Sequence, residues 1–299
     1  MKSTFGGVSR IILSTPSFEL GEGVVISKTF AHLFSQWMMA FNPPGPGGYH
    51  PAPWKAAQGG RGIDVTVEIK VPESTSLGPT FTPQETIWWI AALLRLSYYP
   101  YLSVPVISDQ AFSTITEGTI EPTLTPFETE PRFFRPPGQE PTVLDEKSLE
   151  WLKDSWISAG RLLNAHPRFY SALKAFDSAG IRGKASSSML ALWGGLEQLF
   201  SPSKGELRFR IAAFLAAYHE PPGQSRLEFY KRTLKLYDKR CVAAHTAEEV
   251  ETGPLMNSYV LMRNTLIKII AEDHLPTQNQ LERLLLAWDE DKEVETNDG

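Results

Sequence analysis

Proline is distributed very unevenly along this chain of 299 residues, and this unevenness constrains the fold more than any other feature. Residues 1–145 contain 17 of the 23 prolines, whereas residues 146–299 contain six. Because proline lacks a backbone donor and clashes with the preceding helical turn, a proline-dense half is poorly suited to long helices. The sequence therefore predicts a mixed α+β domain over residues 1–145 and an all-α bundle over residues 146–290.

The first half carries signals for both strands and a helix. Residues 63–71 alternate apolar and polar side chains with a period of two, which is typical of a half-buried strand. Residues 10–13 and 23–26 are shorter strand candidates. Thr82 is followed three residues later by Glu85 and then by an apolar run, which predicts a helix that begins with a capping box.

Two segments of the first half favour irregular structure. Residues 41–60 hold five Pro and five Gly, and we expect a long exposed loop there. Residues 122–141 hold six prolines among polar residues, and we expect an extended linker that ends the N-terminal domain.

Beyond residue 145, apolar residues recur at helical spacing. Leu149, Leu152, Trp156 and Leu163 fall on one helical face, and similar patterns continue to residue 288. These patterns predict about six or seven helices in a bundle. Residues 291–299 are rich in acids and predict a disordered tail.

The net charge of the chain comes from its last residues. The chain has 29 Lys and Arg against 34 Asp and Glu, a net charge of −5, and the last eleven residues alone carry −5. The remainder is neutral. This excludes a uniformly basic nucleic-acid-binding protein and restricts any such site to a local patch.

Several classes of site are excluded by missing motifs. A single cysteine, Cys241, excludes an internal disulfide framework and a multi-cysteine zinc site. The six histidines show no pair at metal-ligand spacing, and no phosphate-binding loop or dinucleotide fingerprint is present. We therefore expect no metal and no cofactor. The N-terminus has no signal-peptide core, and the longest apolar run is too short to cross a bilayer, so we expect a cytoplasmic protein without a membrane partner.

An Arg and a His separated by four residues occur twice, as Arg161 with His166 and as Arg240 with His245. Only the second pair has neighbours that give it a wider pattern. Residues 189–245 contain an apolar helix with Leu-Glu-x-Leu-Phe, then Glu-Leu-x-x-Arg, then Leu-Tyr-x2-Arg-x4-His; the residues are Leu196, Glu197, Leu199, Phe200, Glu206, Leu207, Arg210, Leu236, Tyr237, Arg240 and His245. This run resembles the HEPN superfamily, and within it the Apea-like HEPN branch.

The resemblance implies a metal-independent endoribonuclease, of the kind that serves as a toxin or in defence against phage. It implies that Arg240 and His245 are catalytic, that Glu197 supports them, and that two copies form the site as a homodimer. The chemistry suits these residues, because the imidazole pKa lies nearest neutrality and the guanidinium presents a fork of donors to phosphate. On a regular helix the two side chains diverge by about 140°. They converge if the helix ends near Arg240 or if two copies meet.

A basic stretch leads into this motif. Residues 201–240 contain nine Lys and Arg against four acids, and we interpret Arg208, Arg210 and Lys239 as RNA-binding residues. A solvated charged face of two amphipathic helices explains the same charges.

The sequence leaves two further alternatives open. Arg240 and Glu197 can form a purely structural ion pair, and Trp193 and Tyr237 can be core residues rather than platforms for bases.

Active family members often carry a polar residue after the Arg, where this chain has Cys241, and Thr246 follows the His. A non-catalytic HEPN module for RNA binding or protein interaction is therefore the alternative function, and a helical scaffold remains if the basic patch is self-neutralised.

Overall fold

The computed structural model describes residues 2–34, 38–56, 62–75, 81–97, 101–118, 120–129, 142–180, 184–200, 206–245 and 250–287, with the backbone only of His245. These residues form two compact units, Met1–Trp156 and Ile157–Gly299. The first is mixed α+β and the second is helical, so the predicted order of fold classes along the chain is confirmed. The predicted acidic tail over residues 291–299 lies outside the described residues.

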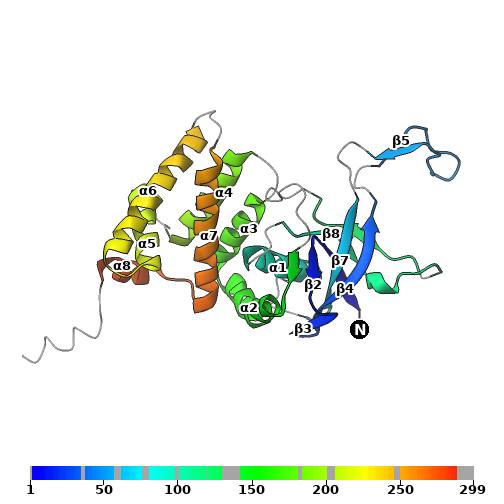
Figure 1. Cartoon of the computed structure of the whole chain (residues 1–299), viewed down its shortest axis with the longest axis horizontal. Helices are drawn as coiled ribbons and strands as arrows, with labels where there is room; N and C mark the ends of the chain where they lie inside the picture. Colours follow the sequence, from blue (N-terminus) through cyan, green and yellow to red (C-terminus); the bar gives the residue numbers. More distant parts are fainter. Residues whose placement is uncertain are drawn as a thin grey trace, which may run out of the picture. The chain divides into compact units, whose positions relative to one another are not determined.

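The described part of the first unit is built on a six-stranded antiparallel sheet with strand order β3–β4–β7–β1–β8–β9 (Figure 1). Its strands are β1 (Ser3–Ser9), β3 (Ser17–Gly21), β4 (Val24–Leu33), β7 (Ile63–Pro72), β8 (Ser103–Ser108) and β9 (Leu124–Pro126). Two smaller ladders pair β2 (Ile11–Leu13) in parallel with β10 (Thr142–Leu144), and β5 (Met38–Ala40) antiparallel with β6 (Trp54–Ala56). The three strands expected from the sequence are all present, as β7, β2 and β4.

Helix α1 (Pro83–Ser97) packs on this sheet, in contact with β1, β7 and β8. Its predicted capping box is confirmed, because the Thr82 amide donates to Glu85 Oε2 at 2.8 Å and the Glu85 amide donates to Thr82 Oγ1 at 3.2 Å. The helix approaches β1 closely at Gly6, where an added Cβ would lie 2.5 Å from the Ile87 side chain. A larger residue at Gly6 would push the helix away from the sheet.

The strand β7 departs from the expected alternation at Glu68. The sequence places Glu68 on the polar face, yet the side chain is buried. Its Oε2 accepts a hydrogen bond of 2.6 Å from the amide of Phe112, in the 3-10 helix η1 (Phe112–Thr114). Burial raises the pKa of Glu68, and this hydrogen bond partly offsets the effect.

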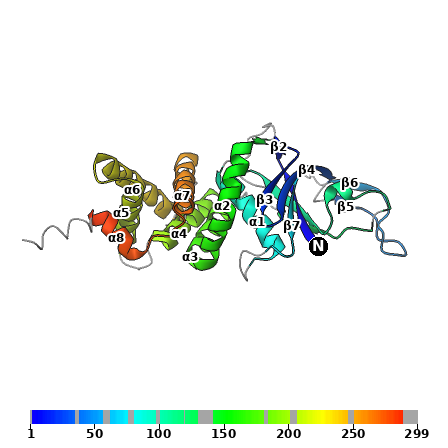
Figure 2. The ribbon, with the colours of Figure 1, turned by 90° about the horizontal axis from the view of Figure 1, so that it is seen from below.

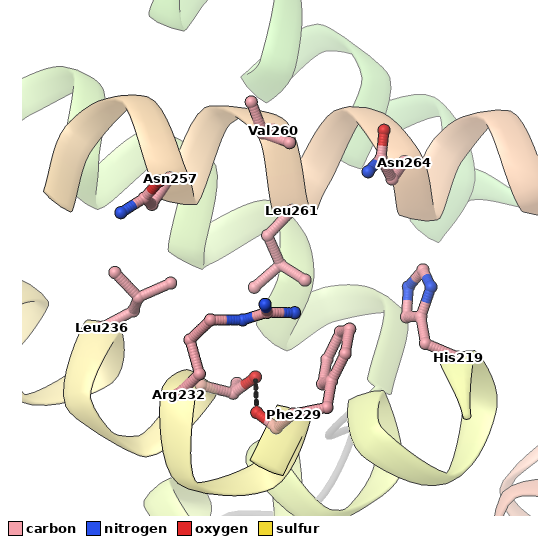
Figure 3. Close-up of a pocket in the computed structure, with 9 residues that line it drawn as sticks. His219, Phe229, Arg232, Leu236, Asn257, Val260, Leu261 and Asn264 are labelled. Carbon is pink, nitrogen blue, oxygen red and sulfur yellow. Dashed lines mark hydrogen bonds between the residues drawn. The ribbon is translucent and has the colours of Figure 1, made fainter. Parts of the chain in front are cut away.

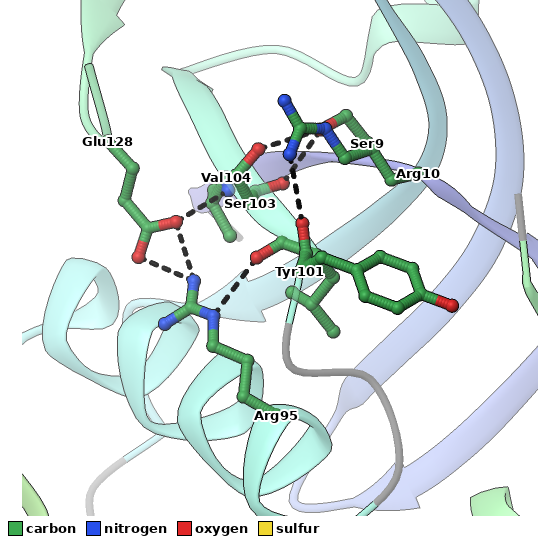
Figure 4. Close-up of polar contacts among 8 residues, drawn as sticks. Ser9, Arg10, Arg95, Tyr101, Ser103, Val104 and Glu128 are labelled. Carbon is green, nitrogen blue, oxygen red and sulfur yellow. Dashed lines mark hydrogen bonds and ion pairs between the residues drawn. The ribbon is translucent and has the colours of Figure 1, made fainter. Parts of the chain in front are cut away.

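Part of the predicted proline-rich linker belongs to the first unit. Strand β9 pairs with β8, and two residues later Glu128 forms an ion pair with Arg95 of α1, whose Nη2 donates to both carboxylate oxygens at 2.5 Å (Figure 4). Glu128 also accepts from the amide of Val104 at 2.8 Å, and Arg95 Nε donates to the carbonyl of Leu102 at 3.1 Å. Residues 130–141 of the predicted linker lie outside the described residues.

The expected loop over residues 41–60 is only partly a loop, because Trp54–Ala56 within it form the strand β6, which pairs with β5. Residues 41–53 form the end of this β-hairpin. In Figures 1 and 2 this hairpin projects from the main sheet. It carries exposed apolar side chains; these are Met38, Met39, Phe41, Tyr49 and Trp54.

Seven described helices follow the last strand, β10, and this number agrees with the six or seven helices predicted from the sequence. They are α2 (Glu146–Ala165), α3 (Pro167–Ala179), α4 (Ala185–Phe200), α5 (Leu207–His219), α6 (Gln224–His245), α7 (Thr252–Glu272) and α8 (Gln278–Leu286). Helix α4 contacts α3, α5, α6 and α7, and α5 contacts α6 and α8. Figures 1 and 2 both show α8 beside α5. The hydrophobic core of the second unit therefore surrounds α4.

The division between the units falls inside α2, between Trp156 and Ile157, whereas the sequence placed it after residue 145. Trp156 is fully buried and its indole N–H donates to the carbonyl of Leu20 at 2.7 Å. The carbonyl of Trp156 in turn accepts from the indole of Trp89 at 2.9 Å. These contacts tie the first half of α2 to the first unit.

Candidate functional site

The candidate catalytic arginine, Arg240, lies on α6 opposite Glu197 of α4. Its Nη2 is 3.2 Å from Glu197 Oε1, and the two side chains are 23% and 18% exposed. Tyr237, one turn earlier on α6, donates its hydroxyl to the same Oε1 at 3.1 Å. The Arg240 guanidinium also lies over the Tyr237 ring, 5.4 Å from its centroid. The ion pair that the sequence left open is therefore present.

The residues beneath this pair are core residues. Trp193 is fully buried, and its indole N–H donates to Ser258 Oγ of α7 at 3.0 Å. Its ring meets Tyr237 edge to face at 5.2 Å. Burial, with the nearby Glu197 charge, raises the pKa of Tyr237 to about 12. Tyr237 therefore stays a neutral donor at pH 7, and neither ring is open for stacking on a base.

One nitrogen of Arg240 is not used by this arrangement. Its Nε is buried and has no hydrogen-bond partner among the described residues. A guanidinium has five N–H donors, and a buried one without a partner costs free energy.

Helix α6 continues without interruption past Arg240 to His245. The first of the two expected routes to convergence, a helix end near Arg240, is therefore wrong. Over five residues of regular helix the side-chain directions differ by about 140° and the backbone rises by about 7.5 Å. The His245 side chain and Thr246 lie outside the described residues. Cys241 is a free cysteine of intermediate exposure.

The cations interpreted as RNA-binding residues are engaged with groups of the same chain. Arg208 forms a bidentate pair with Asp238, at 2.6 and 2.7 Å, and this contact lowers the pKa of Asp238. Lys239 lies 2.7 Å from Glu251. Arg210 lies over the ring of Phe214, 5.8 Å from its centroid. Glu251 and Glu197, which pair with Lys239 and Arg240, lie outside residues 201–240, so the local surface is less positive than the count over those residues indicates.

The structure also brings together a group of residues that the sequence did not single out. His219 at the end of α5, Arg232 on α6 and Asn264 on α7 line one pocket of about 270 Å³ (Figure 3). His219 and Asn264 are 45 residues apart in the sequence, and no sequence motif links the three residues.

Two kinds of feature are absent from the described part of the chain. No group of three or more His, Cys, Asp or Glu side chains there could hold a metal ion. No described helix is long and apolar enough to cross a membrane.

Comparisons with protein-family models, with curated proteins and with solved structures found no match to this chain.

Proposed function

We propose that the helical unit is a HEPN-type module that acts on RNA in the cytoplasm as a homodimer, with Arg240 and His245 as the catalytic pair of a metal-independent endoribonuclease. The observation that carries this proposal is the state of Arg240. Glu197 and Tyr237 fix its position, and Nε has no partner among the described residues. An arginine held in this way is prepared to donate to a phosphate oxygen.

The dimer follows from the geometry of α6. Arg240 and His245 lie on one continuous helix and face different directions, so a single copy does not bring both to one phosphate. Two copies related by a twofold axis would combine the Arg of one with the His of the other. His245 would take the proton of the 2′-hydroxyl as that oxygen bonds to phosphorus, and Arg240 would stabilise the charge on the phosphoryl oxygens. The bond from phosphorus to the 5′-oxygen would break, leaving a 2′,3′-cyclic phosphate, and the His245 imidazolium would return the proton to the 5′-oxygen.

A cleavage assay tests the activity. The purified protein is incubated with total RNA in the presence of EDTA, beside the variants His245→Ala and Arg240→Ala. We expect cleavage by the wild type and none by either variant. His166→Ala is the matched control, because Arg161 and His166 have the same spacing without the surrounding pattern. Cleavage that survives in His245→Ala would show that His245 is not the catalytic histidine.

Mixing the two inactive variants tests the composite site. In a dimer of one Arg240→Ala and one His245→Ala copy, one site loses both groups and the other keeps both. Random exchange should therefore restore about one quarter of the wild-type activity. A mixture as inactive as its components would contradict a site shared between copies.

The non-catalytic module is the second candidate, and the ion pairs favour it. Arg208 with Asp238, Lys239 with Glu251 and Arg240 with Glu197 each join a cation to an acid. Each pair cancels a positive charge at this surface and so reduces the attraction for RNA. A wild-type protein that is folded, does not cleave RNA and binds it without steep salt dependence would support this candidate over the first.

A further inference from the structure

The pocket between α5, α6 and α7 has walls of two kinds. Phe229, Leu236, Val260 and Leu261 supply apolar surface, and His219, Arg232, Thr233, Asn257 and Asn264 supply polar groups. Figure 3 shows the Arg232 side chain reaching across the pocket, with its guanidinium between Leu261 and Phe229. The guanidinium Cζ lies 5.0 Å from the Phe229 ring centroid. The lining contains one cationic side chain and no acid.

Arg232 is an exposed side chain whose guanidinium lies over the ring of Phe229. No hydrogen bond or ion pair joins it to another described residue, in contrast to Arg208 and Arg240. A cation–π contact with a ring leaves the N–H donors of the guanidinium unused. Arg232 therefore retains a fork that matches a carboxylate.

The neighbouring histidine is neutral and has a defined tautomer. Burial, together with the charges of Lys268 and Arg232, lowers the pKa of His219 to about 4. Its Nε2 lies 2.9 Å from Thr265 Oγ1, and that hydroxyl already donates to the carbonyl of Leu261 at 2.8 Å. His219 Nε2 must therefore carry the proton and donate to Thr265. Nδ1 is left as an acceptor, with no hydrogen bond to another described residue.

We propose that this pocket binds a small organic carboxylate with a compact apolar or aromatic body. The carboxylate pairs with Arg232. The body packs against Leu236 and Val260, because the Arg232 guanidinium and the stacked His219 ring already lie against Phe229. This site is separate from the proposed RNA chemistry, because it uses none of Glu197, Arg240 and His245.

The lining argues against other ligand classes. A metal cation would meet one imidazole and an arginine, and no carboxylate. A nucleoside di- or triphosphate would bring several negative charges to a single arginine. The volume of about 270 Å³ lies at the lower end for ligand pockets, so the ligand is small.

A titration of the full chain with 2-naphthoate tests the site, with binding measured by calorimetry and by saturation-transfer NMR. A ligand of this size is expected to bind with a Kd on the order of 1 mM. Arg232→Gln should weaken binding about tenfold, since the charged hydrogen bonds are lost. Lys235→Gln is the matched control, because it removes an exposed charge from α6 outside the pocket lining. Its Kd should equal that of the wild type.

Two further measurements separate the contributions of charge and of apolar contact to the binding of 2-naphthoate. The neutral 2-naphthalenemethanol and inorganic phosphate should each bind more weakly than 2-naphthoate, since each lacks one of the two features. Val260→Phe should also weaken binding, because it fills the pocket from a partly exposed position. The proposal is overturned if the folded wild type does not bind 2-naphthoate, or if Arg232→Gln binds it as the wild type does. Thermal unfolding of each variant confirms that it is folded.

Discussion

Arg240 on α6 and Glu197 on α4 meet at 3.2 Å, in a site where both side chains are largely withdrawn from water. The same carboxylate accepts the hydroxyl of Tyr237. One acid thus orients two neighbouring side chains of α6, so its charge matters both for the stability of the bundle and for the position of the proposed catalytic arginine.

The substitution Glu197→Gln should lower the free energy of unfolding by about 2 kcal/mol, because it leaves Arg240 partly buried without a counter-charge. Arg240→Gln should cost a similar amount, and the double variant should cost less than the sum of the two. Urea denaturation of the four proteins measures this coupling. Asp238→Asn is the control, since the Arg208–Asp238 pair is exposed and should contribute little. Additive effects at residues 197 and 240 would contradict the coupling.

Burial of His219 predicts a dependence of stability on acid. The pKa of His219 is about 4 in the folded chain and lies near 6.5 without that burial. Between these values the unfolded chain binds the extra proton, so the free energy of unfolding falls as the pH drops from about 6.5 to about 4. The loss is on the order of 3 kcal/mol over the whole window. Urea titrations across this window should show a shallower slope for His219→Gln, whereas His274→Gln, at an exposed position, should behave as the wild type.

The buried pair of Arg95 and Glu128 predicts a large effect in the first unit. The side chains are 2% and 15% exposed, so Glu128→Gln leaves a buried guanidinium without its counter-charge. We expect a loss of about 3 kcal/mol in the free energy of unfolding. Amide exchange should accelerate in α1 and β8 and remain unchanged in α7. The exposed pair of Lys2 and Glu73 supplies the control, because Glu73→Gln should have little effect.

Two adjacent glycines of α4 should respond differently to alanine. An added Cβ at Gly194 would meet no atom within 4 Å, so Gly194→Ala should stabilise the helix by about 0.5–1 kcal/mol. At Gly195 the Cβ would lie 2.7 Å from the Cε of Met262, which must move. Gly195→Ala should therefore be less stable than Gly194→Ala in thermal unfolding. Equal stability of the two variants would show that the Met262 side chain of α7 moves aside without lowering the free energy of unfolding.

Local rules predicted those elements whose cause is local. The capping box of Thr82 and Glu85 involves residues within one turn, and the alternation over residues 63–71 reflects the pleat of one strand. The pairing of β5 with β6 depends on contacts across the long loop between them, and no turn motif specifies its register. The burial of Glu68 depends on Phe112, which is 44 residues away.

The candidate site shows the same limit. The sequence supplied Arg240 and its possible partner Glu197, because both belong to one recurrent pattern. The charge count over residues 201–240 omitted Glu197 and Glu251, because their pairing with Arg240 and Lys239 can be identified only when α4, α6 and the start of α7 are placed in space. The pocket around Arg232 could not be predicted from the sequence, because its lining residues come from three helices that meet only in the folded chain.

The position of the unit boundary within α2 decides where the chain can be cut. A truncated chain that begins at Glu146 would keep the whole of α2. It would lose the rest of the first unit, to which the first half of α2 belongs. Leu149, Leu152 and Trp156 are fully buried and belong to that first unit. Their release would present a continuous apolar stripe to solvent, which favours aggregation. Poor solubility of the isolated helical bundle would then reflect the choice of cutting point rather than the stability of the bundle.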